Sequence, residues 1–184
     1  MGGFEGGDEG GFWDIDILPS LTHQQNTSKT TDKAKPYIQT SDSGYSIQAH
    51  AKVKTTDIDQ HSGYICSEEL YDTISFVPCI CESFTIEGCD NIPLESNTIY
   101  KAFHALNDFT NELDIVEFFH AHKVVVTKRI PSSAGLGGGA CDAAAFIRLV
   151  KEVCNLILST DELAEIGNKI DTEVAFFIYN YPSK

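Results

Sequence analysis

The chain has 184 residues, 42% of them hydrophobic, which is enough for one domain with a buried core and short for two. Its formal net charge of −14 disfavours nucleic acids and anionic membranes as partners, and no continuous apolar run is long enough to cross a bilayer. The first residues lack the features of a secretion signal, so we expect a cytoplasmic protein with six free cysteines, while its oligomeric state stays open.

The first 46 residues differ in composition from the rest of the chain. A segment rich in glycine and acidic residues comes first, and a run rich in Thr, Ser, Gln and Asp follows it after a short apolar patch at 12–18. Such a composition buries little apolar surface. We therefore predict a disordered acidic and polar tail over 1–46 and one folded domain over 47–184.

Three segments after the tail have the pattern of β-strands. Residues 46–54 show it weakly, whereas residues 72–78 and 83–87 alternate apolar and polar side chains. We expect the latter two to pair with each other through the turn at 78–81. That turn contains Cys79-x-Cys81, a spacing too tight for the usual zinc knuckle.

The next segments indicate a helix and a further strand. Ser96 or Asn97 can cap a helix that runs to Asn107, and its apolar residues fall on one helical face. Residues 115–119 fit a short helix or a strand equally well. Residues 124–130 predict a strand that leads directly into a glycine-rich segment.

Four glycines lie within five positions after that strand, at Gly135, Gly137, Gly138 and Gly139, and a helical pattern opens behind them. Glycine reaches backbone angles that let consecutive N–H groups converge on an anion. A helix N-terminus adds unpaired N–H groups and partial positive charge. We therefore expect a phosphate site here. The chain's negative charge would repel a nucleotide, so these N–H groups and a metal ion must compensate locally.

The spacing of the glycines separates the known kinds of phosphate site. A P-loop ends in Gly-Lys-Ser/Thr, which is missing here, so that class is excluded. Residues 135–140 match the dinucleotide pattern G-x-G-x-x-A. That pattern requires a second strand about 20 residues further on, where this sequence predicts a helix. A dinucleotide-binding oxidoreductase therefore remains only the runner-up.

The last third of the chain predicts two helices and a strand. One apolar stripe follows the glycines, with Ile157 as its last member, and Ser159 to Glu162 then has the form of a capping box that starts a second helix. The apolar run 174–179 predicts a final strand. Strands with one early helix, followed by strand, loop, helix, helix and strand, place the protein in the α+β class.

The segment Ile130–Gly139, followed by Asp142–Ala145, resembles the signature loop of the GHMP kinases. Flanking stretches narrow the likeness to the kinases that phosphorylate 4-diphosphocytidyl-2-C-methyl-D-erythritol in the non-mevalonate isoprenoid pathway. The resemblance implies the N-terminal domain of the GHMP-kinase fold (ribosomal protein S5 domain 2-like), with the C-terminal domain absent. It also implies a small-molecule substrate, with ATP and Mg²⁺ as cofactors.

The same resemblance implies roles for individual residues. Glu173 stands where the family has a catalytic aspartate, Lys52 matches the family's assisting lysine, and Tyr64 matches a tyrosine beside the cytosine of the substrate. No residue is implied as a metal ligand. The residues implied to hold the ATP phosphates are Pro131, Ser133, Ala134, Gly135, Leu136, Gly137, Gly138, Gly139, Ala140, Cys141 and Asp142.

Several positions depart from the family pattern. Besides Glu173, Lys54 stands for an asparagine, Ile65 for a histidine, and Ala140 and Cys141 for two serines. An extra methylene moves a carboxylate by about 1 Å, which can cost roughly 100-fold in rate. A truncated nucleotide-binding domain without turnover is therefore the alternative to an active kinase. A scaffold that acts through its acidic tail is a further possibility.

Overall fold

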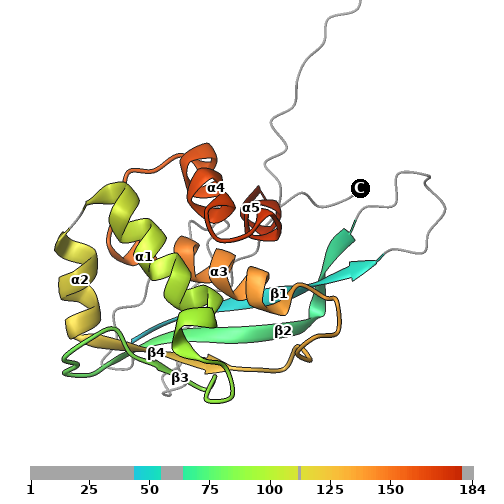
Figure 1. Ribbon diagram of the computed structural model, residues 1–184, viewed down its shortest axis with the longest axis horizontal. Coiled ribbons are helices and arrows are strands. Elements are labelled where there is room, and N and C mark those ends of the chain that lie inside the picture. The colour runs from blue at the N-terminus through green and yellow to red at the C-terminus, as the bar shows by residue number, and fades with distance from the viewer. Residues whose placement is uncertain (1–43, 55–63, 112, 180–184) are drawn as a thin grey trace, which may run out of the picture.

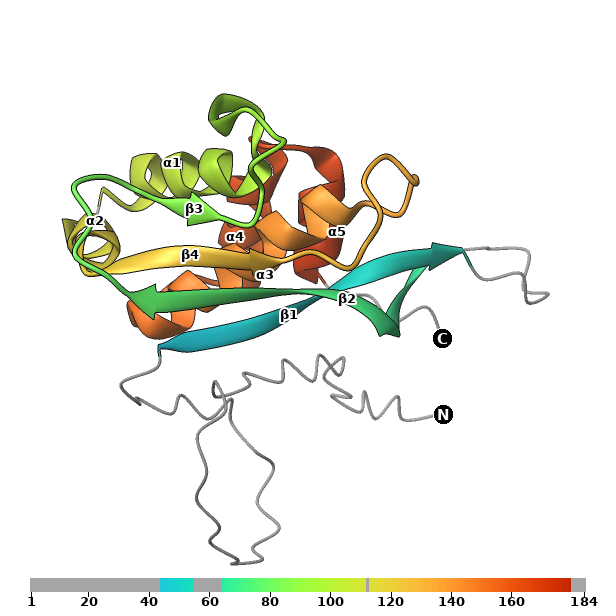
Figure 2. The ribbon, with the colours of Figure 1, turned by 90° about the horizontal axis from the view of Figure 1, so that it is seen from below.

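The computed structural model describes residues 44–54, 64–111 and 113–179, so most of the predicted tail lies outside the described residues (Figure 1). Four strands form one sheet in the order β1-β2-β4-β3, and the helices lie on one side of it (Figures 1 and 2). The strands are β1 (Tyr45–Lys54), β2 (Tyr64–Pro78), β3 (Ile86–Glu87) and β4 (His122–Thr127). The predicted α+β class is confirmed.

The two longest strands, β1 and β2, pair antiparallel, with a bulge between His50 and Lys52. On β2 the side chains of Asp72, Ile74 and Phe76 alternate with more exposed neighbours and are fully buried. Successive side chains of a strand point to opposite faces, so these three face the helices. An aspartate on the apolar face of a strand requires a partner, and the site below supplies it.

The predicted pairing of 72–78 with 83–87 is wrong. Residues 72–78 are part of β2, but within 83–87 only Ile86–Glu87 is strand. This short strand, β3, pairs parallel with β4 on the side of β4 away from β2. The reason lies in the predicted turn, where the N–H groups of Cys79 and Cys81 donate to the carbonyls of Ala121 and His120, each at 2.9 Å. These bonds carry the chain past β4 instead of back along β2.

The early helix follows the sequence closely. α1 (Thr98–Thr110) is capped by Asn97, whose Oδ1 accepts from the Ile99 N–H at 2.9 Å. A single 3-10 turn, η1 (Leu94–Ser96), precedes it. The ambiguous segment 115–119 is part of a helix, α2 (Leu113–His120). The predicted apolar face of α1 is confirmed, since its buried residues are Ile99, Ala102, Phe103 and Leu106.

α3 (Gly138–Val153) follows the glycine-rich segment and packs on β1 and β2. The helix ends sooner than the predicted apolar stripe, which included Ile157, because the backbone of Asn155 adopts the left-handed region at a φ of 51°. Ile157 therefore lies beyond the helix and is fully exposed. α4 (Thr160–Asn168) begins with the predicted capping box, which is confirmed by bonds in both directions between Ser159 and Glu162.

The final apolar run is a helix, α5 (Thr172–Tyr179), so the predicted strand over 174–179 is wrong. Asp171 starts the helix, since its Oδ1 accepts from the Glu173 N–H at 2.8 Å. A short apolar run fits a buried strand or a buried helix equally well, and packing decides between them. Here a Cβ on Gly167 of α4 would lie only 2.9 Å from Ile178, so the close approach of α4 and α5 fixes the helix.

The topology also excludes the dinucleotide-binding alternative. The element after α3 is the helix α4, where that fold requires a strand, and the longest strands pair antiparallel. Within the part of the chain that the structure describes, no helix has the length and apolar character needed to cross a bilayer.

Candidate active site

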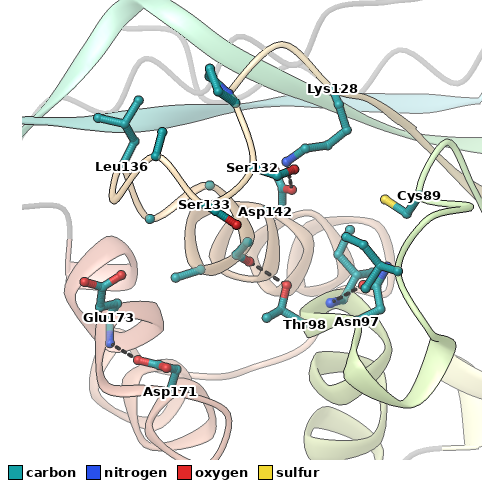
Figure 3. A pocket seen from close by; sticks show the side chains of 18 of the residues that line it. Cys89, Asn97, Thr98, Lys128, Ser132, Ser133, Leu136, Asp142, Asp171 and Glu173 are labelled. Carbon is teal, nitrogen blue, oxygen red and sulfur yellow. Dashed lines mark hydrogen bonds and ion pairs between the residues drawn. The ribbon is translucent and has the colours of Figure 1, made fainter.

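A cavity of about 330 Å³ lies where three helices begin (Figure 3). The glycine-rich segment 131–140 forms one wall, the start of α1 around Thr98 forms another, and Asp171 and Glu173 at the start of α5 form a third. Lys128 and Asp142 also line it. Each helix start directs partial positive charge at the same space. This convergence is the local compensation that a polyphosphate needs in a chain with a net charge of −14.

The N-terminus of α3 is open toward this cavity. Its N-cap is Gly137, at a φ of 70°, and no side chain caps the helix. The N–H groups of the first turn have no acceptor within a helix, so Gly138, Gly139 and Ala140 present donors. Such groups at a helix start bind phosphate and other anions well.

Gly137 allows the close approach of α5. A Cβ at this position would lie 2.9 Å from the Phe177 ring and 3.2 Å from Glu173 Oε2. The first of these distances is a clash that backbone or ring movement would have to relieve. The second shows that the Glu173 carboxylate lies directly beside the start of α3 (Figure 3).

Gly135 gives a useful contrast to Gly137. Its φ is 71°, almost the same, but a Cβ there would meet no heavy atom within 4 Å. The turn requires glycine-like backbone angles at both positions. Of the two, only Gly137 must also lack a side chain so that Phe177 and Glu173 of α5 can pack close to it.

α1 is tied to α3 across the cavity. Thr98 Oγ1 donates to the carbonyl of Gly139 at 2.6 Å, and this bond joins the first turns of the two helices. Because both helix starts are held together, their N–H groups have a fixed separation before any ligand binds. Preorganised donors of this kind stabilise negative charge without the cost of reordering.

A buried ionic cluster anchors the glycine-rich segment to the sheet. Lys128 Nζ lies 2.5 Å from Asp72 Oδ2 and 2.7 Å from Asp142 Oδ2, and both carboxylates are almost fully buried. Asp72 Oδ1 also accepts from the N–H groups of Arg129 and Ile130. The cluster therefore joins β2, the residues before the glycines and α3.

Two carboxylates share one ammonium in this cluster, and this sharing, together with burial, shifts the pKa values of Lys128 and Asp142. Burial acts to lower the pKa of Lys128, but Asp142 and Asp72 outweigh it and hold that pKa above its usual value. Burial raises the pKa of Asp142 to about 7, and the neighbouring Asp72 adds to the rise while Lys128 opposes it. Asp142 Oδ1 is buried without a hydrogen-bond partner among the described residues. The cluster is therefore poised to hold or lose one proton near neutral pH.

The sequence-predicted residues divide into three groups. Ten of the eleven residues assigned to the phosphates line the cavity, as does Glu173. The eleventh, Cys141, is buried behind the first turn of α3, where its thiol donates to the Gly138 carbonyl. Lys52 and Tyr64 pair through their backbones with Cys66 and Lys54, and their side chains lie outside the described part of the structure. Their assigned roles stay predictions.

Sequence reasoning missed Lys128, Asp72, Thr98 and Asp171. A signal existed for Asp72, because it shares the alternating phase of Ile74 and Phe76 and so had to be buried. No pattern in the sequence pointed to the other three, since their roles depend on contacts with distant segments.

The geometry suits the phosphates of a nucleotide. A volume of about 330 Å³ lies at the lower end of small-molecule sites, and the uncapped start of α3 offers backbone donors in the glycine-rich wall. For Mg²⁺ the described residues hold no cluster of three or more His, Cys, Asp or Glu side chains able to bind a metal. Such an ion is commonly held by substrate phosphates, water and one or two carboxylates. Glu173 and Asp171 contribute carboxylates to the cavity wall.

Comparison with known proteins gives a consistent result. Residues 97–180 match the model of the GHMP kinases N terminal domain. A 4-diphosphocytidyl-2-C-methyl-D-erythritol kinase of Sulfurovum sp. (strain NBC37-1) is 50% identical over 148 residues, which cover 76% of this chain and 57% of the relative. A kinase of the same name from Sulfurimonas denitrificans (strain ATCC 33889 / DSM 1251) is 47% identical over 118 residues, covering 62% and 44%.

Among solved structures, a crystal structure of 4-(cytidine 5'-diphospho)-2C-methyl-D-erythritol kinase is 19% identical, with a TM-score of 0.45 over 74% of this chain and 47% of that chain. The chain spans a little over half the length of the Sulfurovum relative. The family match over 97–180, the sequence identities and the α+β topology agree, so this part of the chain has the GHMP kinase N-terminal domain.

Proposed function

We propose that the chain is the nucleotide-binding part of an ATP-dependent phosphotransferase that acts on an alcohol, with 4-diphosphocytidyl-2-C-methyl-D-erythritol as the acceptor. Relatives that are 50% and 47% identical to it over the aligned residues carry the name of that kinase. The enzyme would work in the cytoplasm in the synthesis of isoprenoid precursors.

One observation carries the proposal. The uncapped start of α3 and the Glu173 carboxylate line the same cavity side by side, with Oε2 only 3.2 Å from the Cβ position of Gly137 (Figure 3). Phosphoryl transfer needs donors for the phosphate oxygens and a group that orients the attacking hydroxyl. Both kinds of group are present in one space.

In this proposal the N–H groups of Gly138, Gly139 and Ala140 hold the phosphates. The Glu173 carboxylate accepts or orients the proton of the acceptor hydroxyl as it attacks. Lys52 stabilises negative charge on the attacking oxygen, and Tyr64 contacts the cytosine of the acceptor. Mg²⁺ would enter with the nucleotide and neutralise charge on the transferred phosphoryl group, with Glu173 or Asp171 as the protein's contribution to its coordination.

The alternative is nucleotide binding without turnover. It is motivated by glutamate at the position where the family has aspartate and by the half-length coverage of the relatives. The two functions share the cavity but differ in what Glu173 does.

The test measures transfer of labelled γ-phosphate from ATP to the acceptor, together with nucleotide affinity by calorimetry. We expect Glu173→Gln to lower turnover by about 10²–10⁴-fold, with nucleotide affinity changed less than about threefold. Glu165→Gln is the matched control, since it makes the same substitution at an exposed glutamate of α4 that does not line the cavity, and it should change turnover little.

Three outcomes separate the possibilities. Nucleotide binding with no product from the wild-type chain would select the alternative. Equal losses in the two variants would remove Glu173 as the proton acceptor. If the wild-type chain bound no nucleotide, the proposal would be wrong in both forms.

A further inference from the structure

A second chemical feature lies at the opposite end of the sheet from the glycine-rich segment, just after β2 (Figure 2). Here the sulfur atoms of Cys79 and Cys81 are 2.7 Å apart, with the Cys81 thiol as donor, and both cysteines are free. Nothing in the proposed kinase chemistry uses them. Two thiols in direct contact form a dithiol, which can do chemistry that neither could do alone.

The segment that carries the two sulfurs is held at both of its ends. The Cys79 N–H donates to the Ala121 carbonyl and the Cys81 N–H to the His120 carbonyl, each at 2.9 Å. The His120 ring also contacts the Cys81 carbonyl, with Nδ1 at 3.0 Å. The sulfur contact is therefore built into the connection between β2 and β3 and does not depend on a chance rotamer of a loose loop.

The dithiol is open to solvent on one side. Ile80, between the two cysteines, is fully exposed, and Cys79 is half-buried while Cys81 is buried. A small reagent can therefore reach Cys79 first, with Cys81 placed behind it. This arrangement of an outer attacking thiol and an inner resolving thiol is typical of redox-active pairs.

The charges near the pair also favour reaction. A hydrogen bond to Cys79, with burial, raises the pKa of Cys81, whereas the Thr85 hydroxyl and the Lys123 ammonium act to lower it. The Cys81 proton therefore stays on the inner sulfur, from which it is donated to Cys79 Sγ. Lys123, bonded to Glu87 at 2.7 Å, adds a fixed positive charge close by.

We propose that Cys79 and Cys81 form a reversible disulfide by exchange with a low-molecular-weight disulfide. The Cys79 thiolate attacks one sulfur of that disulfide, whose S–S bond breaks and releases one thiol. Cys81 then attacks Cys79 Sγ, loses its proton and releases the second thiol. The protein loses two protons and two electrons, and the small disulfide takes them up to become two thiols. The second step is fast, because the sulfurs are already in contact.

The experiment incubates the full chain with buffers of oxidised and reduced glutathione and follows intact mass, free thiols and alkylated peptides. We expect the free thiols to fall from six to four, with one bond joining residues 79 and 81, and full recovery on reduction. In Cys81→Ser, the reaction should stop at a stable glutathione adduct on Cys79. In Cys79→Ser, it should be at least tenfold slower.

Cys154→Ser is the matched control, since Cys154 is also half-buried but has no thiol beside it among the described residues. It should behave as the wild type. A stable glutathione adduct on wild-type Cys79, a bond from residue 79 or 81 to any other cysteine, or no reaction under conditions that oxidise a free Cys-x-Cys peptide would each overturn the proposal. Because the wild-type chain itself gives the decisive result, a variant that fails to fold cannot obscure it.

Discussion

Two cavities in the described part of the domain have equal volumes, about 330 Å³ each, and very different walls. The first, which we call the polar cavity, is bounded by the glycine-rich segment and three helix starts. The second, the aromatic cavity, lies between α1, α2 and the segment around Phe84. There the rings of Phe84 and Phe103 stack at 4.1 Å and Phe119 meets Phe84 edge to face.

α1 contributes to both cavities, with its first residues in the polar one and Tyr100, Phe103 and His104 in the aromatic one. One helix therefore lines one cavity with its first residues and the other with its ring side chains. The comparison teaches that volume does not distinguish the two cavities as candidate phosphate sites. What distinguishes the polar cavity is the uncapped start of α3, where backbone N–H groups lie among glycines.

The largest expected effect concerns the ionic support under the polar cavity. Lys128→Met leaves two buried carboxylates without their cation, so we expect the free energy of unfolding to fall by about 3–5 kcal/mol. Denaturant titration measures this change. Lys123→Met is the matched control: both lysine side chains are 26% exposed, but the partner of Lys123, Glu87, is 51% exposed.

An exposed ion pair of this kind contributes about 0–1 kcal/mol. Similar losses in the two variants would show that the buried cluster supports the polar cavity no more than a surface pair would.

The second effect concerns space in the polar cavity. Gly137→Ala and Gly135→Ala should each cost about 1–2 kcal/mol of stability, because both residues have a positive φ. Only Gly137→Ala adds a Cβ that meets Phe177 and Glu173, so it alone should weaken Mg-ATP binding, by about 10–100-fold or roughly 1.4–2.7 kcal/mol. Calorimetric titration of each variant gives both affinities.

Phe84→Leu in the aromatic cavity is the control for that experiment. It should leave nucleotide affinity within about twofold of the wild type, because the ring lies in the other cavity. If Phe84→Leu weakened binding as much as Gly137→Ala did, the nucleotide would not be confined to the polar cavity.

The third effect is a pH dependence that belongs to the polar cavity. Burial raises the pKa of Asp142 from an ordinary value of 3.8 to about 7, so the folded state holds a proton that the unfolded state releases. The stability contribution of this group is therefore complete below about pH 4 and falls as the pH rises to about 7, by at most ~1.4 kcal/mol per pH unit. Denaturant titration of wild type and Asp142→Asn at successive pH values isolates it.

The amide that Asp142→Asn introduces cannot titrate, so the stability difference, wild type minus variant, should fall between pH 4 and 7 and then level off. A difference that rises with pH would mean that Lys128 outweighs burial and holds the pKa of Asp142 low.

Much of the local structure could be predicted from the sequence. The cap at Asn97, the buried face of α1 and the capping box at Ser159 all follow from interactions within four residues of one another. The glycine-rich segment belongs to the same class, because the positive φ values at Gly135 and Gly137 are a property of the residue type.

The errors lie where distant segments meet. The run 174–179 is a helix because α5 packs closely against Gly167. β3 pairs with β4 because the carbonyls of His120 and Ala121 accept hydrogen bonds from the segment after β2. Neither outcome can be predicted from the local sequence pattern, since a short apolar run fits a buried strand and a buried helix equally well.

The sequence by itself determined that this protein has a glycine-rich segment between a strand and a helix, because backbone freedom and hydrophobic periodicity are local. Only the tertiary structure decided that three helix starts surround that segment, that Lys128 reaches Asp72 across 56 positions of the chain, and that Glu173 faces the first turn of α3. These features depend on which buried surfaces pack together, and burial is settled by the whole fold at once.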